Sequence, residues 1–445
     1  MRIRHSSLHW PHGIGFAAAV FALIAAALIG RKLPIMDEVL FLSPARQATV
    51  HEVLEKTRWH SGSVPLGFLM ERAFLQITGY SVWLARIPAA LLGVASVLAV
   101  GVLAGKLRAA TPWMASALFA AFPLTLRYTL EARPYTLALL FSLALTLLFL
   151  ELAERPAFLV ACAYGLVALL ATYTQPFAAL VCGAHFLWAA IYGRVRAAAY
   201  VGGAAAIAAA ALVPWYLWAR SAWAYESAQQ SFGFVFAVKR PLMLVRELTG
   251  AGYWGFGILL ALCVLGAMGS GLDRKAVVLL LLLIAVPLAG GLLADALFGY
   301  FLAARQFLWV LPAVAILAAS PWVARPRATA ALALLFAAVC GYKSVRYFNQ
   351  PEPDWEAAAK AIASEVDRGA CFRVAPEIAR GLYAYFAPQL DRRQEACPTV
   401  VAAALPFTSQ RDRDALIEDL VRKGYAELRT DNVAGTFLAI LRRRD

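Results

Sequence analysis

The stretch PYTLALLFSLALTLLFL, residues Pro134–Leu150, contains no charged residue. A helix of about 20 apolar residues, at about 1.5 Å per residue, crosses the hydrocarbon core of a bilayer. Proline suits the first turn of a helix, because the N–H that it lacks would have no partner there. The stretch therefore predicts a membrane-spanning helix that begins at Pro134.

Similar runs recur through the first 345 residues. Four prolines, Pro112, Pro134, Pro156 and Pro176, follow one another at intervals close to the length of a span, so the punctuation of the sequence agrees with the thickness of a bilayer. Eleven spans are expected, at residues 13–30, 84–105, 112–128, 134–150, 157–173, 176–192, 197–217, 251–270, 276–296, 303–320 and 328–344.

The composition divides the chain into two parts. Hydrophobic residues make up 62% of the 445 and charged residues 15%, and the mean hydropathy is +0.67. A soluble domain is about half apolar and about a quarter charged. Because 29 of the 68 charged residues lie in 351–445, we expect an all-α polytopic membrane domain over 1–345 and a small soluble α/β domain over 346–445.

The basic balance and the cysteines bear on partners and compartment. A net charge of +14 in such an apolar chain favours contacts with lipid phosphates over nucleic acid. The first apolar run resembles a signal peptide but lacks a small-x-small cleavage site, so an uncleaved first helix is expected. Cys371 and Cys397 are the two cysteines of the tail. They could pair if the tail faces an oxidising compartment.

The segment Val64–Thr78 decides the topology. It is short and carries Glu71 and Arg72 at its middle, where charge is costly in a bilayer, so we interpret it as an interfacial helix. The amino terminus and most short basic loops then share the inner side, while loop 31–83 and the tail lie outside. The outer loops also carry Lys and Arg, so the positive-inside rule alone leaves the orientation open.

The carboxylates favour an enzyme over a transporter. A transporter usually keeps ionisable groups near the middle of the membrane. Here nine of the twelve carboxylates in the first 350 residues fall on the predicted outer side, which favours chemistry at that face. They are Asp37, Glu38, Glu52, Glu55, Glu71, Glu131, Glu226, Glu247 and Asp295.

The adjacent pair Asp37 and Glu38 follows the first span. Neighbouring side chains point in different directions, so one carboxylate could act as a general base while the other orients it. A solvated acidic loop accounts for the same two residues. Their place within a few residues of a membrane face favours the catalytic interpretation.

Three arginines mark the same predicted face. Arg127 and Arg133 flank Glu131 between two spans, and Arg133 directly precedes a helix whose amino-terminal N–H groups favour an anion. Arg305 opens a later span. A lipid phosphate could be held there, and arginines that extend toward the headgroups are the alternative.

Glu131, Tyr135, Tyr173 and His60 are further candidates for binding substrate at this face. Tyr135 lies two positions after Arg133. Tyr173 ends a span and fits an aromatic belt, and His60 lies in the first outer loop. Histidines and glutamates in that loop leave a divalent metal open, although no HxxxH or CxxC spacing supports one. The sequence has no phosphate-binding loop and no dinucleotide-binding glycine cluster, so nucleotide-driven chemistry is not expected.

The tail alternates helix-like and strand-like segments, as a small α/β domain does. With eleven spans and an inside amino terminus it lies outside, where it binds acceptor or caps the active site. Helices are expected at 354–368, 377–386 and 411–423, and strands at 371–375, 399–405 and 437–441.

Taken in order, these motifs resemble the GT-C superfamily of lipid-linked sugar transferases, in particular glycosyltransferase family 39 with the protein O-mannosyltransferases and the bacterial aminoarabinose transferase of lipid A. Ser63, Val64 and Gln306 stand where that family usually has histidine, proline and tyrosine. The resemblance rests on Asp37-Glu38, Val64–Leu69, Gly79–Pro88, Glu131–Tyr135, Arg305 ahead of Val310–Pro312, and Asp354-Trp355.

The resemblance implies an inverting glycosyltransferase with the GT-C fold. Asp37 would be the general base, with Glu38 supporting it, and Arg127, Arg133 and Arg305 would neutralise the phosphate of a polyprenyl-phosphate sugar donor. The acceptor would be a lipid such as lipid A, a glycan or a protein, at the periplasmic face of the inner membrane. A transporter or flippase of lipid-linked sugars is the alternative, followed by a noncatalytic membrane assembly protein.

Overall fold

The computed structural model describes residues 10–60, 62–229, 244, 246–269, 271–298, 303–375, 377–392, 397–406 and 408–444. They form two compact units, which are described separately: Met1–Ile29 with Ala48–Phe348, and Gly30–Gln47 with Asn349–Asp445. The predicted outer loop 218–250 and the turn 297–302 lie partly outside the described residues.

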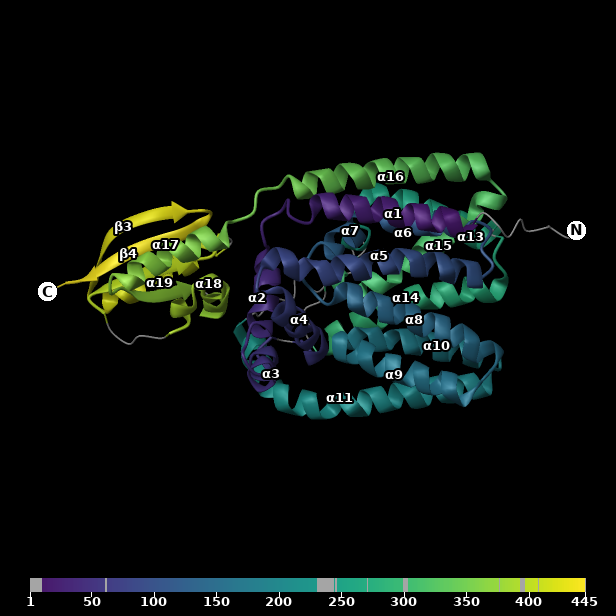
Figure 1. Ribbon diagram of the computed structural model, residues 1–445, viewed down its shortest axis with the longest axis horizontal. Coiled ribbons are helices and arrows are strands. Elements are labelled where there is room, and N and C mark those ends of the chain that lie inside the picture. Colours follow the sequence, from purple (N-terminus) through teal and green to yellow (C-terminus); the bar gives the residue numbers. More distant parts are fainter. Residues whose placement is uncertain are drawn as a thin grey trace, which may run out of the picture. The chain divides into compact units, whose positions relative to one another are not determined.

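The first unit is a bundle of helices (Figure 1). Within the described residues, eight helical segments are long and apolar enough to cross a membrane. Three shorter apolar segments accompany them, and each of the eleven predicted spans coincides with one of these segments. Seven of the eight are single helices: α1 (Trp10–Leu28), α5 (Val82–Lys106), α8 (Tyr135–Glu154), α11 (Val195–Gln229), α13 (Gly252–Gly269), α14 (Arg274–Phe298) and α16 (Pro326–Phe348). The eighth is one continuous segment made of η2 (Ala304–Val310), α15 (Leu311–Ala319) and η3 (Ser320–Val323). The three are α6 (Pro112–Ala121), α9 (Phe158–Thr174), and η1 (Pro176–Ala178) with α10 (Ala179–Ile191).

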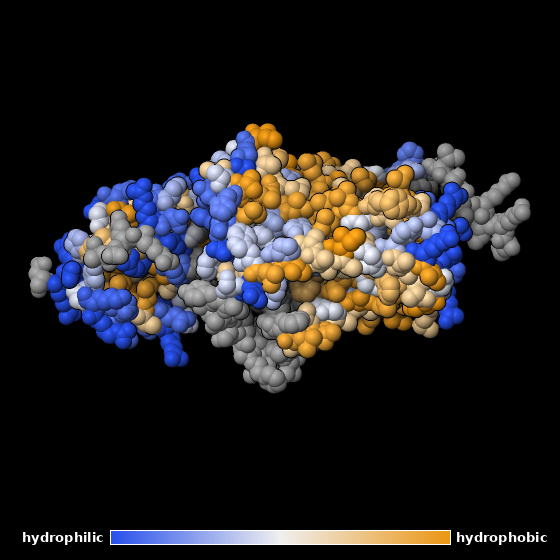
Figure 2. Space-filling model, turned by 90° about the horizontal axis from the view of Figure 1, so that it is seen from below, coloured by the Kyte–Doolittle hydropathy of each residue, from blue (hydrophilic) through white to orange (hydrophobic). Residues whose placement is uncertain are grey.

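The bundle buries one segment and exposes apolar side chains elsewhere. In Ala304–Val323, 89% of the most apolar stretch is buried, so this segment lies in the centre. Large side chains such as Phe16, Ile207 and Leu334 are about two-thirds exposed or more, at 73%, 67% and 72%. Figure 2 shows such hydrophobic side chains over most of the visible face of the bundle. An apolar surface of this extent requires lipid around it, so the chain is a multi-pass membrane protein.

The predicted span 112–128 is broken rather than continuous. Phe122 has extended backbone angles, φ −61° and ψ 125°, and separates α6 from α7 (Pro123–Thr129). The cause is Pro123, because its ring disfavours helical angles at the residue before it. At the end of α7, helix α5 approaches closely. A Cβ on Gly93 would lie 2.3 Å from Thr129 Oγ1, so only glycine permits this packing.

Two short helices follow the segment that carries Asp37 and Glu38. Helix α3 (Val50–Arg58) begins at a capping box in which Thr49 and Glu52 each bond the other's backbone N–H. Helix α4 (Pro65–Thr78) ends at Gly79, whose φ of +88° suits glycine. With 14 residues α4 is too short to cross a bilayer. A helix at Val64–Thr78 is thus confirmed, and its interfacial position remains a prediction.

The second unit contains α2 (Met36–Ala45) and a four-stranded sheet with the order β1-β2-β4-β3. Strands β1 and β2 are parallel, and the other pairs are antiparallel. The predicted α/β tail is confirmed, but strand β3 was not predicted. The elements are α17 (Trp355–Asp367), β1 (Cys371–Ala375), η4 (Glu377–Ala379), α18 (Arg380–Phe386), η5 (Pro388–Asp391), β2 (Thr399–Ala404), α19 (Gln410–Arg422), β3 (Tyr425–Val433) and β4 (Thr436–Arg443).

A disulfide joins Cys371 of β1 to Cys397, with Cα atoms 5.7 Å apart, and it closes the loop that leads to β2. Replacing both cysteines by Ser is expected to remove about 2–4 kcal/mol of stability, because the open loop gains entropy when the tail unfolds. Protease resistance of the tail during heating of the purified protein measures this. The variant Cys162→Ser, at a free and exposed thiol, is the control. Equal melting of the native tail with and without reductant would contradict a structural bridge.

Candidate active site

Arg127, Glu131 and Tyr347 form a polar cluster at the end of α7. Arg127 Nε donates a hydrogen bond of 2.7 Å to Glu131 Oε1, and the Tyr347 hydroxyl donates to the same oxygen at 3.1 Å. The Arg127 guanidinium also lies over the Tyr347 ring, 4.7 Å from its centroid. Glu131 is only 4% exposed. Two donors from different helices therefore meet at one carboxylate oxygen of a buried glutamate.

Arg133 lies at the start of α8. Its backbone N–H bonds the Glu131 carbonyl at 2.8 Å, and Pro134 is the N-cap of α8. Its guanidinium is 4.9 Å from the centroid of the Tyr135 ring, and that ring packs edge-on against Tyr128 at 5.2 Å. The aromatic rings thus place a half-buried guanidinium beside the positive end of a helix dipole.

Arg305 joins this region through the central segment. It is half-buried in η2, and η2 packs against both α7 and α8. The neighbouring Gln306 accepts a hydrogen bond from the Ala303 N–H at 2.9 Å, which fixes the start of η2. Three arginines therefore come from adjoining elements, with Glu131 as a carboxylate among them. An excess of positive charge of this kind suits a phosphate.

Tyr173 and His60 each contact a nearby helix. The Tyr173 hydroxyl, near the end of α9, donates to the Ala211 carbonyl of α11. The His60 ring stacks on Phe68 of α4, with centroids 6.1 Å apart. These contacts hold Tyr173 to α11 and His60 to α4, and a role for either in binding substrate stays a prediction.

Asp37 and Glu38 belong to the second unit and lie in the first turn of α2. A carboxylate in that position is favoured by the helix dipole. Glu38 is fully buried, whereas Asp37 is half-buried and reaches the surface of its unit. The two carboxylates therefore have different surroundings, which suits a reacting group and a supporting group.

The described residues contain no group of three His, Cys, Asp or Glu side chains that could hold a metal ion. These residues therefore offer no set of ligands for the divalent metal that the sequence allowed.

Two aromatic residues of this site were not predicted. Tyr128 directly follows Arg127 in the sequence, and that neighbour was the available signal. Tyr347 comes from the end of α16, 216 positions from Glu131, and only the fold brings it there.

Comparison with known proteins gives a fold. No protein-family model matches the sequence, and no curated protein matches it. Among solved structures, ArnT from Cupriavidus metallidurans bound to undecaprenyl phosphate is similar over 98% of both chains, with a TM-score of 0.55 and 15% identity. The arabinofuranosyltransferase AftD from Mycobacteria is similar over 97% of this chain and 40% of its own length, with a TM-score of 0.57 and 16% identity. The protein therefore has the fold of the GT-C glycosyltransferases.

Proposed function

We propose that the protein is an inverting glycosyltransferase that moves a hexosyl or pentosyl group from a polyprenyl phosphate to an acceptor. The observation that carries this proposal is the cluster of Arg127, Arg133 and Arg305 on adjoining elements. It occurs in a fold shared with ArnT, which was crystallised with undecaprenyl phosphate. A lipid phosphate is the anion that such a cluster in a membrane protein would meet.

The chemistry is a displacement at the anomeric carbon. Asp37 takes the proton of the acceptor hydroxyl, whose oxygen then forms a bond to the anomeric carbon. The bond between that carbon and the phosphate oxygen breaks, and the arginines stabilise the negative charge on the departing phosphate. Because the acceptor attacks opposite the leaving group, the configuration inverts. The leaving group is already activated, so no nucleotide is needed.

The reaction would take place at the periplasmic face of a bacterial inner membrane. The disulfide between Cys371 and Cys397 supports this orientation, since such bonds persist in oxidising compartments. The acceptor there would be lipid A, another glycan or a protein.

The test uses the purified protein in vesicles with a polyprenyl-phosphate sugar and candidate acceptors. Mass spectrometry should detect free polyprenyl phosphate together with a glycosylated acceptor, and NMR of the product should show inverted configuration. Envelope lipids and glycans from a deletion strain identify the natural acceptor. Movement of the intact lipid-linked sugar across the vesicle membrane, without cleavage, would instead indicate a flippase.

A further inference from the structure

We infer that the C-terminal domain positions the acidic pair, with Lys32 and Arg46 as the positioning residues that tie α2 to it. This inference rests on the proposed function, because it assigns Asp37 the role of base. Its basis is that Gly30–Gln47 forms one compact unit with Asn349–Asp445, although about 300 residues separate them in the chain.

The first contact lies before α2. Lys32 Nζ forms an ion pair of 2.8 Å with Glu352 Oε1, and the two side chains are only 7% and 25% exposed. Beside it, Arg31 donates a longer hydrogen bond of 3.5 Å to Asn349. A shielded pair is screened less by salt and water than a surface pair. It therefore fixes the chain five positions ahead of Asp37.

The second contact lies at the other end of the helix. Arg46, the C-cap residue of α2, donates to the backbone carbonyl of Tyr385, and its guanidinium lies 5.2 Å from the centroid of the Tyr385 ring. Between the ends, α2 packs along α18. A Cβ on Gly381 would lie 3.7 Å from Ser43 Oγ, which is van der Waals contact. The carboxyl-terminal part of α2 is thus held against α18.

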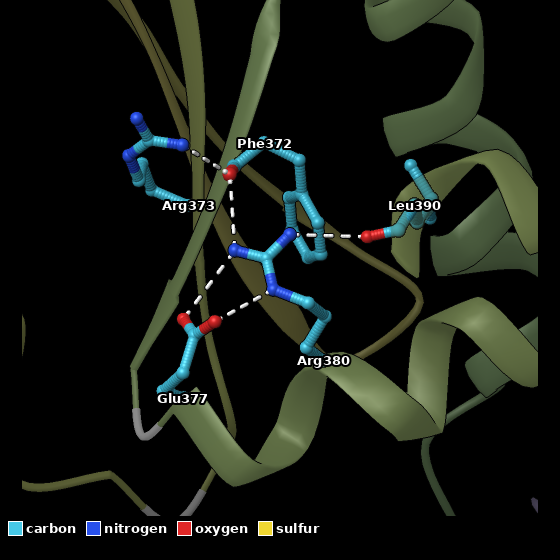
Figure 3. A network of polar contacts seen from close by, with 5 residues as sticks. All are labelled: Phe372, Arg373, Glu377, Arg380 and Leu390. Atoms are coloured by element: carbon cyan, nitrogen blue, oxygen red, sulfur yellow. Dashed lines mark hydrogen bonds and ion pairs between the residues drawn. The ribbon is translucent and has the colours of Figure 1, made fainter. Parts of the chain in front are cut away.

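Helix α18 is in turn fixed to the sheet by the buried Arg380. Figure 3 shows its guanidinium between Glu377, the Leu390 carbonyl and the Phe372 carbonyl. The hydrogen bonds measure 2.7 and 3.3 Å to the Glu377 carboxylate, 3.0 Å to Leu390 and 3.2 Å to Phe372 of β1. Arg380 is 6% exposed, so its guanidinium is largely shielded from water. Hydrogen bonds and packing therefore connect β1 through α18 to α2.

The side chains around α18 are also buried and closely packed. Tyr383 is fully buried and packs edge-on against Phe372 and Trp355, with ring centroids 5.8 and 6.3 Å away. Burial raises the pKa of its hydroxyl to about 12. The surface that receives α2 therefore belongs to a well-packed domain.

This arrangement matters because catalysis depends on placement. A catalytic group must be held within about 0.5 Å of its productive position, and a displacement of about 1 Å can cost about 10²-fold in rate. Glu38 is fully buried, so the first turn of α2 is packed against the protein around it. Loosening either end of α2 should move Asp37 while leaving the arginine cluster of the first unit unchanged.

The experiment reverses the charge of Glu352. The variant Glu352→Lys is expected to lower kcat about tenfold or more at an unchanged KM for the polyprenyl-phosphate sugar, because the base moves and the phosphate site does not. The double variant Lys32→Glu with Glu352→Lys restores the pair and should recover most of kcat. The matched control is Glu356→Lys, which breaks the exposed pair of Glu356 with Lys360 on the same domain. It should leave kcat unchanged.

Rates are compared per folded protein, from monodisperse samples of equal melting temperature, so that a loss of stability alone does not lower kcat. A kcat for Glu352→Lys equal to that of Glu356→Lys, or no recovery in the double variant, would overturn the positioning role. The proposed function is judged separately. If Asp37→Asn is inactive while Glu352→Lys is fully active, the base assignment stands and the positioning role fails.

Discussion

Replacing Asp37 by Asn is expected to reduce sugar transfer by about 10²–10⁴-fold, which is the contribution of a general base. Asn has the shape of Asp but cannot accept the proton of the acceptor hydroxyl at neutral pH. Because Asp37 is half-buried rather than enclosed, the substitution leaves no cavity and should not disturb α2. The KM for the polyprenyl-phosphate sugar should stay close to that of the native protein.

The measurement is single-turnover transfer in vesicles, with insertion and melting temperature checked for each variant. Asp367→Asn, an exposed Asp at the end of α17 in the same unit, is the matched control and should transfer at the native rate. Glu38→Gln separates the pair, since a supporting group should affect the rate less than the base does. Full transfer by Asp37→Asn would remove the proposed mechanism.

Most of the helical unit could be predicted from the sequence because bilayer thickness sets the length of an apolar run. The break at Phe122 was missed, although Pro123 is a local signal that a helix is interrupted. Strand β3 was missed for another reason. It is an edge strand that is largely exposed, so its polar residues carry no apolar alternation that would mark it.

Some residues of the candidate site could be predicted from the sequence, and others could not. Arg127, Glu131 and Arg133 lie within seven positions, so one motif in the sequence contained them. Tyr347, which completes the cluster, is 216 positions from Glu131 and has no local pattern that marks it. The same holds for the contact between Lys32 and Glu352. Contacts of this kind arise from the packing of distant elements, and one sequence does not contain them.

Replacing Arg133 by Gln is expected to lower kcat/KM for the polyprenyl-phosphate sugar by about 10²–10³-fold, which is typical for the loss of one group that stabilises a developing anion. Arg133 is chosen because it combines a guanidinium, a supporting Tyr135 ring and the start of α8. Arg133→Lys should recover only part of the rate, since an ammonium keeps the charge but loses the paired donors.

The matched control for this variant is Arg325→Gln. Arg325 also directly precedes a proline at the start of a helix, but it is exposed and lies next to the amino-terminal end of α16, whereas Tyr347 is near the carboxyl-terminal end. The two variants remove the same charge from the same local motif, so a general effect on insertion would appear in both. A loss confined to Arg133→Gln, together with weaker inhibition by added polyprenyl phosphate, would place the leaving phosphate at the arginine cluster. Equal rates in the two variants would mean that Arg133 only anchors the helix in the headgroup region, and the phosphate would then have to be bound elsewhere.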